Sequence, residues 1–148
     1  MDKDDVIDVL NTLIEVSKDG EFGFTTCAEF ARSPALRTLL QRRADDCSEA
    51  VRELQMAVQR HGGRPEGDGS VAGALHRGWV AARTLLSGYR DETILEECER
   101  GEDLALRQYA DAIANPLPAD LHSLLQRQLA GVSRTHDQIR RLRDELPA

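Results

Sequence analysis

The sequence has few aromatic residues, no long apolar run and no excess of basic residues, and each deficit excludes a class of protein. Aromatic residues make up 4% of its 148 residues, so a sheet rich in aromatic side chains is disfavoured. No apolar segment approaches the roughly 20 residues that cross a bilayer. With 26 acidic against 19 basic residues, the net charge of −7 argues against a nucleic-acid-binding surface, which requires a concentrated positive face.

Cysteines are also few. The chain has three, an odd number without the spacing of a metal or redox motif, so we expect free thiols. The N-terminal residues MDKDDVIDV are acidic and lack the basic start and apolar stretch of a signal peptide. Together these features predict a soluble, cytoplasmic protein that binds neither nucleic acid nor membrane.

What the sequence does have is the composition and periodicity of α-helices. Leu, Ala, Glu and Arg dominate, and apolar residues recur at helical spacing between capping residues and helix breakers. We predict an all-α fold in a single domain, residues 1–148. Its four long helices and one short helix are expected at residues 3–31, 34–61, 71–87, 91–114 and 118–146.

The lengths of the links predict the directions of the helices. Short links join the first two long helices and the last two, so the helices of each pair must be antiparallel. The middle connection, residues 62–90, contains the short helix, which at about 1.5 Å per residue is about 25 Å long. It can return the chain to its starting end and leave the second and third long helices parallel. One long crossover of this kind is the connectivity of ferritin-like four-helix bundles.

One carboxylate interrupts the apolar face of the helix at 91–114. At helical spacing, Glu102 falls between Cys98 and Tyr109 on that face. A buried carboxylate costs several kcal/mol unless a cation, a hydrogen bond or a metal compensates it. We therefore expect a partner for Glu102 elsewhere in the chain.

Counting about 1.5 Å of rise per residue along each helix places several polar or sulfur-containing residues at one level of the interior. They are Glu21, Cys47, Cys98, Glu102 and His136. His136 is the expected partner of Glu102, and Glu21 is a second candidate. The two carboxylates and the imidazole form a ligand set that suits iron, manganese or zinc.

A second interpretation needs no metal. Glu102 and His136 would then form a hydrogen-bonded pair between helices that fixes their register. The cysteines at positions 27, 47 and 98 are predicted to be small core residues rather than reactive thiols.

The remaining polar side chains are interpreted as surface features. Arginines at the outer faces, including Arg37, Arg42, Arg43 and Arg134, are expected to be solvated, although Arg43 also shares an inward position of the second long helix with Ala44. On the short helix, His76 and Arg77 lie beside Trp79 and form a candidate interaction face, although Trp79 can instead fill a groove between long helices.

Three segments carry a resemblance to a known family: GSVAGALHRGW at 69–79, ILEECERGEDLAL at 94–106, and His136-Asp137 followed by RLRD at 141–144. On these segments the chain resembles a bacterial family of uncharacterised four-helix-bundle proteins, placed in the ferritin-like superfamily and known as a domain of unknown function. The resemblance covers nearly the whole chain and implies a ferritin-like bundle without an assigned reaction.

The wider superfamily builds di-iron centres from a Glu on the first and third helices and a Glu-x-x-His motif on the second and fourth. By this resemblance, Glu21 and Glu102 match the single glutamates and His136 matches the last histidine. Ser133 stands where the glutamate of the fourth helix is required, and the second helix has Cys47 at an inward position and no Glu-x-x-His. At most three of the six ligands are present, which disfavours a di-iron centre.

Three functional hypotheses follow. The first is a non-catalytic or weakly metal-binding bundle, with a polar core on Glu102 and His136 and iron or manganese as the candidate metals; by analogy it would be a homodimer. The second is a metal-dependent oxidoreductase that acts on oxygen or peroxide. The third is a helical interaction module in stress response that docks through the face at His76, Arg77 and Trp79.

Overall fold

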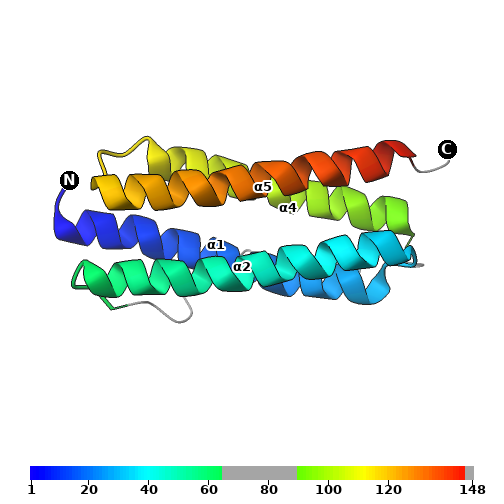
Figure 1. Ribbon diagram of the computed structural model, residues 1–148, viewed down its shortest axis with the longest axis horizontal. Coiled ribbons are helices and arrows are strands. Elements are labelled where there is room, and N and C mark those ends of the chain that lie inside the picture. The colour runs from blue at the N-terminus through cyan, green and yellow to red at the C-terminus, as the bar shows by residue number, and fades with distance from the viewer. Residues whose placement is uncertain (65–89, 146–148) are drawn as a thin grey trace.

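The computed structural model describes residues 1–64 and 90–145, and the regular structure within these ranges is entirely helical. The helices of this part of the chain are α1 (Lys3–Phe30), α2 (Pro34–Arg60), α4 (Asp91–Ile113) and α5 (Ala119–Glu145), and they lie side by side as a bundle (Figure 1). Each of the four begins and ends within one residue of the bounds expected from the sequence. The prediction of an all-α bundle is therefore confirmed for the described residues.

Two predictions from the sequence concern a fifth, short helix and the absence of membrane spans. The helix expected at 71–87, with the candidate interaction face at His76, Arg77 and Trp79, lies outside the described residues. Among the four described helices, none combines the length and the apolar character that crossing a membrane requires.

Contacts at the two ends of the bundle define the directions of the helices. At one end, Asp91 at the start of α4 accepts hydrogen bonds from the backbone N–H groups of Arg32 and Ser33, at 2.7 and 2.9 Å, in the link between α1 and α2. At the other end, Nε2 of His61, just after α2, lies 3.0 Å from Oδ2 of Asp120 at the start of α5. Helices α2 and α4 therefore run in one direction and α1 and α5 in the other, as the colours of Figure 1 show.

Local sequence explains where the helices begin and end. Side-chain oxygens of Asp2 and Ser33 each accept a hydrogen bond from the backbone N–H three residues further on, at 2.9 and 3.3 Å, and so cap α1 and α2. Pro34 occupies the first position of α2, where its missing N–H costs nothing. Gly62, with φ of 83°, follows the end of α2 in the left-handed conformation that glycine adopts most readily.

The hydrophobic core is divided into two clusters by a polar layer. One cluster contains Leu10 and Leu125, and the other contains Leu40 and Ile94. On every helix, a few residues separate the members of one cluster from the members of the other, and on α4 this interval contains Glu102. On α1 and α5 the same interval contains buried polar residues, Ser17 and Asp19 on α1 and Thr135 on α5, and on α2 the buried Arg43 lies about one turn before it.

Helices α1 and α2 pack against each other more extensively than any other described pair. Gly20 permits this approach, because a Cβ at this position would lie 2.9 Å from Sγ of Cys47. Real Cβ atoms almost never approach a heavy atom so closely. The absence of a side chain at Gly20 therefore determines how closely α2 lies against α1 beside the polar layer.

Replacing Gly20 with alanine is expected to lower the free energy of unfolding by about 1 kcal/mol. Overpacking against Cys47 costs about 1–3 kcal/mol, and the better helix propensity of alanine returns about 1 kcal/mol of this. In the double variant Gly20→Ala/Cys47→Ala, the new methyl group occupies space that the sulfur has left. Urea denaturation of the two single variants and the double variant should therefore show favourable coupling of about 1 kcal/mol.

The matched control for this cycle is Gly131→Ala on α5. A Cβ there meets only Nη2 of Arg134, at 3.7 Å. This variant should gain about 1 kcal/mol from helix propensity alone. Additive effects of Gly20→Ala and Cys47→Ala would contradict the steric explanation.

Candidate functional site

Glu102 is fully buried, as the sequence predicts, but its partner is Arg43. Nε of Arg43 donates a hydrogen bond to Oε1 of Glu102 at 2.7 Å, and the side chain of Arg43 is only 8% exposed. The prediction of a Glu102–His136 hydrogen bond and the prediction of a solvated Arg43 are therefore wrong. A charged, directed hydrogen bond satisfies the buried carboxylate oxygen without a metal.

Arg43 reaches the interior from the edge of the apolar face of α2. Its carbon chain can lie along apolar side chains while the guanidinium extends inward, and its Cζ lies 5.4 Å from the ring centroid of Phe24, a cation–π distance. In the sequence, Arg43 falls at helical spacing between Leu40 and Cys47, which are both buried. That spacing was the available signal for its burial.

His136 contacts the residue next to Glu102 instead. Its Nε2 lies 2.8 Å from Oδ1 of Asp103, an exposed residue of α4. Burial raises the pKa of Glu102 above its ordinary value; Arg43 opposes this rise, and His136 opposes it more weakly. His136 therefore lies near enough to Glu102 to act on its charge without bonding to it.

The structure does not bring Glu21, Glu102 and His136 together as a ligand set. Glu21 is half-buried on α1. Within residues 1–64 and 90–145, no group of three or more His, Cys, Asp or Glu side chains is arranged to hold a metal ion. The second carboxylate oxygen of Glu102, Oε2, is buried and has no hydrogen-bond partner in this part of the chain.

The cysteines Cys27, Cys47 and Cys98 are free and buried, as predicted from the sequence. Burial raises the pKa of the Cys47 thiol to about 12. Burial also raises the pKa of Cys98, with a further contribution from its hydrogen bond with Cys27. Protonated thiols are weak nucleophiles at neutral pH, so the raised pKa values of Cys47 and Cys98 make both poor nucleophiles.

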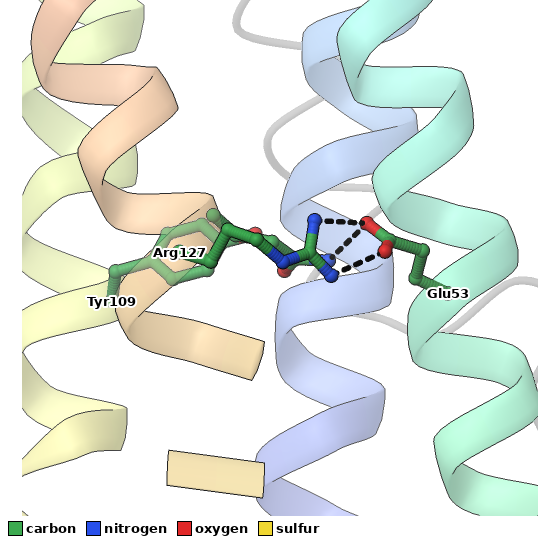
Figure 2. A network of polar contacts seen from close by, with 4 residues as sticks. Glu53, Tyr109 and Arg127 are labelled. Carbon is green, nitrogen blue, oxygen red and sulfur yellow. Dashed lines mark hydrogen bonds and ion pairs between the residues drawn. The ribbon is translucent and has the colours of Figure 1, made fainter. Parts of the chain in front are cut away.

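A second polar network joins three helices next to the first. The hydroxyl of Tyr109 on α4 donates to Oε1 of Gln128 on α5 at 2.8 Å, and Nε2 of Gln128 donates to Oε1 of Glu53 on α2 at 3.3 Å. Figure 2 shows Arg127 of α5 reaching across to the same carboxylate, to which it donates through both terminal nitrogens. Burial alone would raise the pKa of Glu53, but the hydrogen bonds from Arg127 and Gln128 lower it below its ordinary value.

This network crosses a cleft. Helices α2 and α5 pack loosely, and a cleft of about 290 Å³ lies between them. Ser17, Arg43, Cys47 and Tyr109 line both this cleft and a second cavity of about 30 Å³ on the side of α1 and α4. Because they separate the two spaces and are all buried, these four residues form the floor of the cleft. Its walls carry mainly charged or small side chains, among them Asp46, Glu49, Ala50 and Glu53 from α2 and Arg127, Gln128, Gly131 and Arg134 from α5.

Within the described residues, only one of the three guanidinium nitrogens of Arg43 makes a hydrogen bond. A guanidinium carries five N–H donors, four of them on its two terminal nitrogens. Within the described residues, Arg43 makes its hydrogen bond through Nε, and its terminal nitrogens make none. Arg43 lines the cleft on one side and the small cavity on the other. Its terminal donors are therefore available to a molecule that enters the cleft.

The sequence matches the family model described as Domain of unknown function (DUF2383) over residues 5–115. The chain belongs to the DUF2383 family. This match spans α1, α2 and α4 and includes Arg43, Glu102 and Tyr109, whereas α5 lies beyond it. No curated protein matches the sequence.

Membership of DUF2383 supplies no reaction, because the description of the family assigns none. A fold shared within a family does not define chemistry, which depends on the groups that meet at a site. For this DUF2383 protein, these groups are the Arg43–Glu102 pair and the walls of the cleft beside it.

Proposed function

We propose that the protein is a non-catalytic, ferritin-like bundle that binds a small polar molecule in the cleft between α2 and α5. The observation that carries this proposal is Arg43, which is more than nine-tenths buried and whose two terminal nitrogens, beside the cleft, have no hydrogen-bond partner among residues 1–64 and 90–145. Glu102 holds the guanidinium through Nε, so its other donors are oriented before a ligand arrives. Such preorganisation lowers the entropic cost of binding.

The ferritin-like part of the proposal is supported by the parallel course of α2 and α4. Two helices that follow each other in the chain can be parallel in a bundle only if a long connection joins them, and one such connection is typical of ferritin-like bundles. Arg43 donates to Oε1 of Glu102, so a metal ion could use only the second oxygen, Oε2, of this carboxylate. The homodimer expected by analogy belongs to the same proposal, and light scattering of the purified protein measures it.

Binding of the ligand can be tested by thermal unfolding in the presence of small-molecule probes. The probes are millimolar carboxylates, aminocarboxylates, amines, inorganic phosphate and neutral polyols. A compound that binds only the folded state at ten times its Kd adds about 1.4 kcal/mol to the free energy of unfolding. We expect at least one class to raise Tm in proportion to the logarithm of its concentration. No shift with any class would refute the proposed function.

Gly131 offers a variant that blocks the cleft and still folds. A Cβ at this position meets only Nη2 of Arg134, at 3.7 Å, the open cleft lies beyond it, and leucine favours a helix over glycine by about 0.8 kcal/mol. Gly131→Leu should therefore be at least as stable as the wild type but should lose the ligand-dependent rise in Tm. Ala130→Leu, on the exposed face of the same helix, is the matched control and should keep it. An equal response of both variants would place binding elsewhere.

One observation favours a second candidate, weak binding of iron or manganese. Oε2 of Glu102 is buried without a partner in the described residues, and His136 acts electrostatically on the same carboxylate. Elemental analysis of protein purified without added metal separates the two candidates. Near-stoichiometric metal that is lost in both Glu102→Ala and His136→Ala would support the metal site, whereas metal-free protein that still responds to the probes would support the first proposal.

A further inference from the structure

The floor of the cleft selects the chemical group that binds deepest. The donors of Arg43 that have no partner in the described part of the chain lie on its two terminal nitrogens, which form a planar fork. A planar carboxylate can accept two parallel hydrogen bonds from such a fork. The adjacent Tyr109 hydroxyl already donates its proton to Gln128, so it can offer only its lone pairs to a ligand. Ser17 on the same floor forms a hydrogen bond with Tyr109. The charged donors of the floor therefore belong to Arg43, and they fit a carboxylate.

The charges around the cleft argue against a ligand that is only an anion. Arg43 is neutralised by Glu102, and Arg127 is neutralised by Glu53. The remaining charged side chains of the walls are Asp46, Glu49 and Arg134, which make no hydrogen bond or ion pair within the described residues. They leave one net negative charge at the mouth, which repels a phosphate and attracts a positive group.

The Arg43 donors that fit a carboxylate and the acidic side chains that attract a positive group lie a short distance apart along α2. Asp46 lies three residues after Arg43, a rise of about 4.5 Å, and Glu49 lies one further turn along. A single small molecule can therefore place a carboxylate on Arg43 and an ammonium group beside Asp46 and Glu49. The cleft volume of about 290 Å³ is just below the roughly 300 Å³ at which small-molecule pockets begin, and so favours a ligand the size of an amino acid.

We infer that the ligand of the cleft is a small aminocarboxylate, whose carboxylate binds Arg43 and whose ammonium group faces Asp46 and Glu49. This inference rests on the proposed function and adds the chemical class of the ligand. A molecule of this class is neutral overall and brings to each end of the cleft the charge that the protein lacks there. Its two ends also distinguish it from monocarboxylates, amines and phosphate.

Isothermal titration of the full chain with three matched probes tests the inference. The probes are 4-aminobutyrate, butyrate and butylamine, which share a carbon chain and differ in their charged ends; inorganic phosphate is the fourth titrant. We expect 4-aminobutyrate to bind at least tenfold more tightly than each of the other three. Equal affinity for butyrate, or tighter binding of phosphate or butylamine, would overturn the inference.

Variants at the mouth of the cleft test the role assigned to the ammonium group. Asp46→Asn/Glu49→Gln changes two exposed residues, so the fold should persist, and the affinity for 4-aminobutyrate should fall about tenfold, to that of butyrate. Asp45→Asn, an exposed neighbour that does not line the cleft, is the matched control and should change neither affinity. Gly131→Leu should abolish binding of 4-aminobutyrate. An unchanged affinity in the double variant would overturn the inference.

The outcomes separate the inference from the proposed function. If none of these four titrants binds but another class raises Tm in the wild type and not in Gly131→Leu, the cleft is a binding site and the aminocarboxylate assignment is wrong. If no class raises Tm, the proposed function fails as well.

Discussion

Replacing Arg43 with methionine is expected to lower the free energy of unfolding by about 3–5 kcal/mol, the usual cost of removing one partner of a buried ion pair. Glu102 is 0% exposed, so without Arg43 its carboxylate must either remain charged in the polar layer of the core or take up a proton. Urea denaturation monitored by circular dichroism measures the change. Arg42→Met, at the exposed neighbouring position, is the control and should alter stability by no more than about 0.5 kcal/mol.

The double variant Arg43→Met/Glu102→Leu should recover most of this loss. Apolar side chains of similar volume often replace a buried ion pair without net cost, because neither charge then has to be desolvated. The same variant should no longer bind 4-aminobutyrate, since the donors of the cleft floor are gone. Recovered stability with lost binding would show that the pair is retained for its donors rather than for the fold. A loss below about 1 kcal/mol in Arg43→Met would contradict the buried pair itself.

The second large effect is expected in the pH dependence of stability. Asp19 is 4% exposed, and its Oδ2 has no hydrogen-bond partner in the described residues. Burial, with a smaller contribution from the charge of Glu15, raises the pKa of Asp19 from 3.8 to about 7. Because the folded state holds the proton more tightly than the unfolded state, the contribution of Asp19 is fully present below about pH 4 and is lost as the pH rises through about 7.

Asp19→Asn should remove this pH dependence. At pH 4 the variant and the wild type should have similar stability, whereas at pH 8 the variant should be more stable by about 2–3 kcal/mol. Urea denaturation at intervals between pH 4 and pH 8 tests this expectation. Asp8→Asn, an exposed position on the same helix, is the control and should follow the wild type. A difference between wild type and Asp19→Asn that does not vary with pH would exclude the raised pKa.

The helices could be predicted from the sequence because their signals are local. Apolar spacing, the cap at Ser33 with Pro34, and the glycines after His61 depend only on neighbouring residues. The burial of Glu102 follows from the same spacing. The lengths of the links then gave the directions of the helices, since a long connection between two short ones leaves few arrangements.

The partner of Glu102 could not be predicted in the same way. Arg43 begins at the edge of an apolar face, and the spacing of Cα atoms does not show whether a long side chain turns inward or outward. His136 was placed at the correct level to within one helical turn, but the adjacent Asp103 competes for it and lies closer to the surface. Helical spacing therefore located the polar layer without identifying its bonds.

The cleft carries no sequence motif. It arises because α2 and α5 pack loosely and present small residues, Ala50 and Gly131, along part of their facing surfaces. Tyr109 and Gln128 fall at inward-facing positions of their helices, but whether an inward side chain meets another helix or an open space depends on the distance between helices. That distance is a property of the assembled bundle.

The hydrogen bonds of Asp91 and the contact of His61 with Asp120 have a mechanical consequence for this cleft. They tie the α1–α2 hairpin to the α4–α5 hairpin at opposite ends of the bundle, while the central turns of α2 and α5 are joined mainly through Glu53 and Arg127. Separating the two helices in the middle while their ends stay in place would therefore break the Glu53–Arg127 ion pair and the Glu53–Gln128 hydrogen bond. Entry of a ligand by this route opens these two contacts, and the hydrogen bonds at the ends of the bundle need not break.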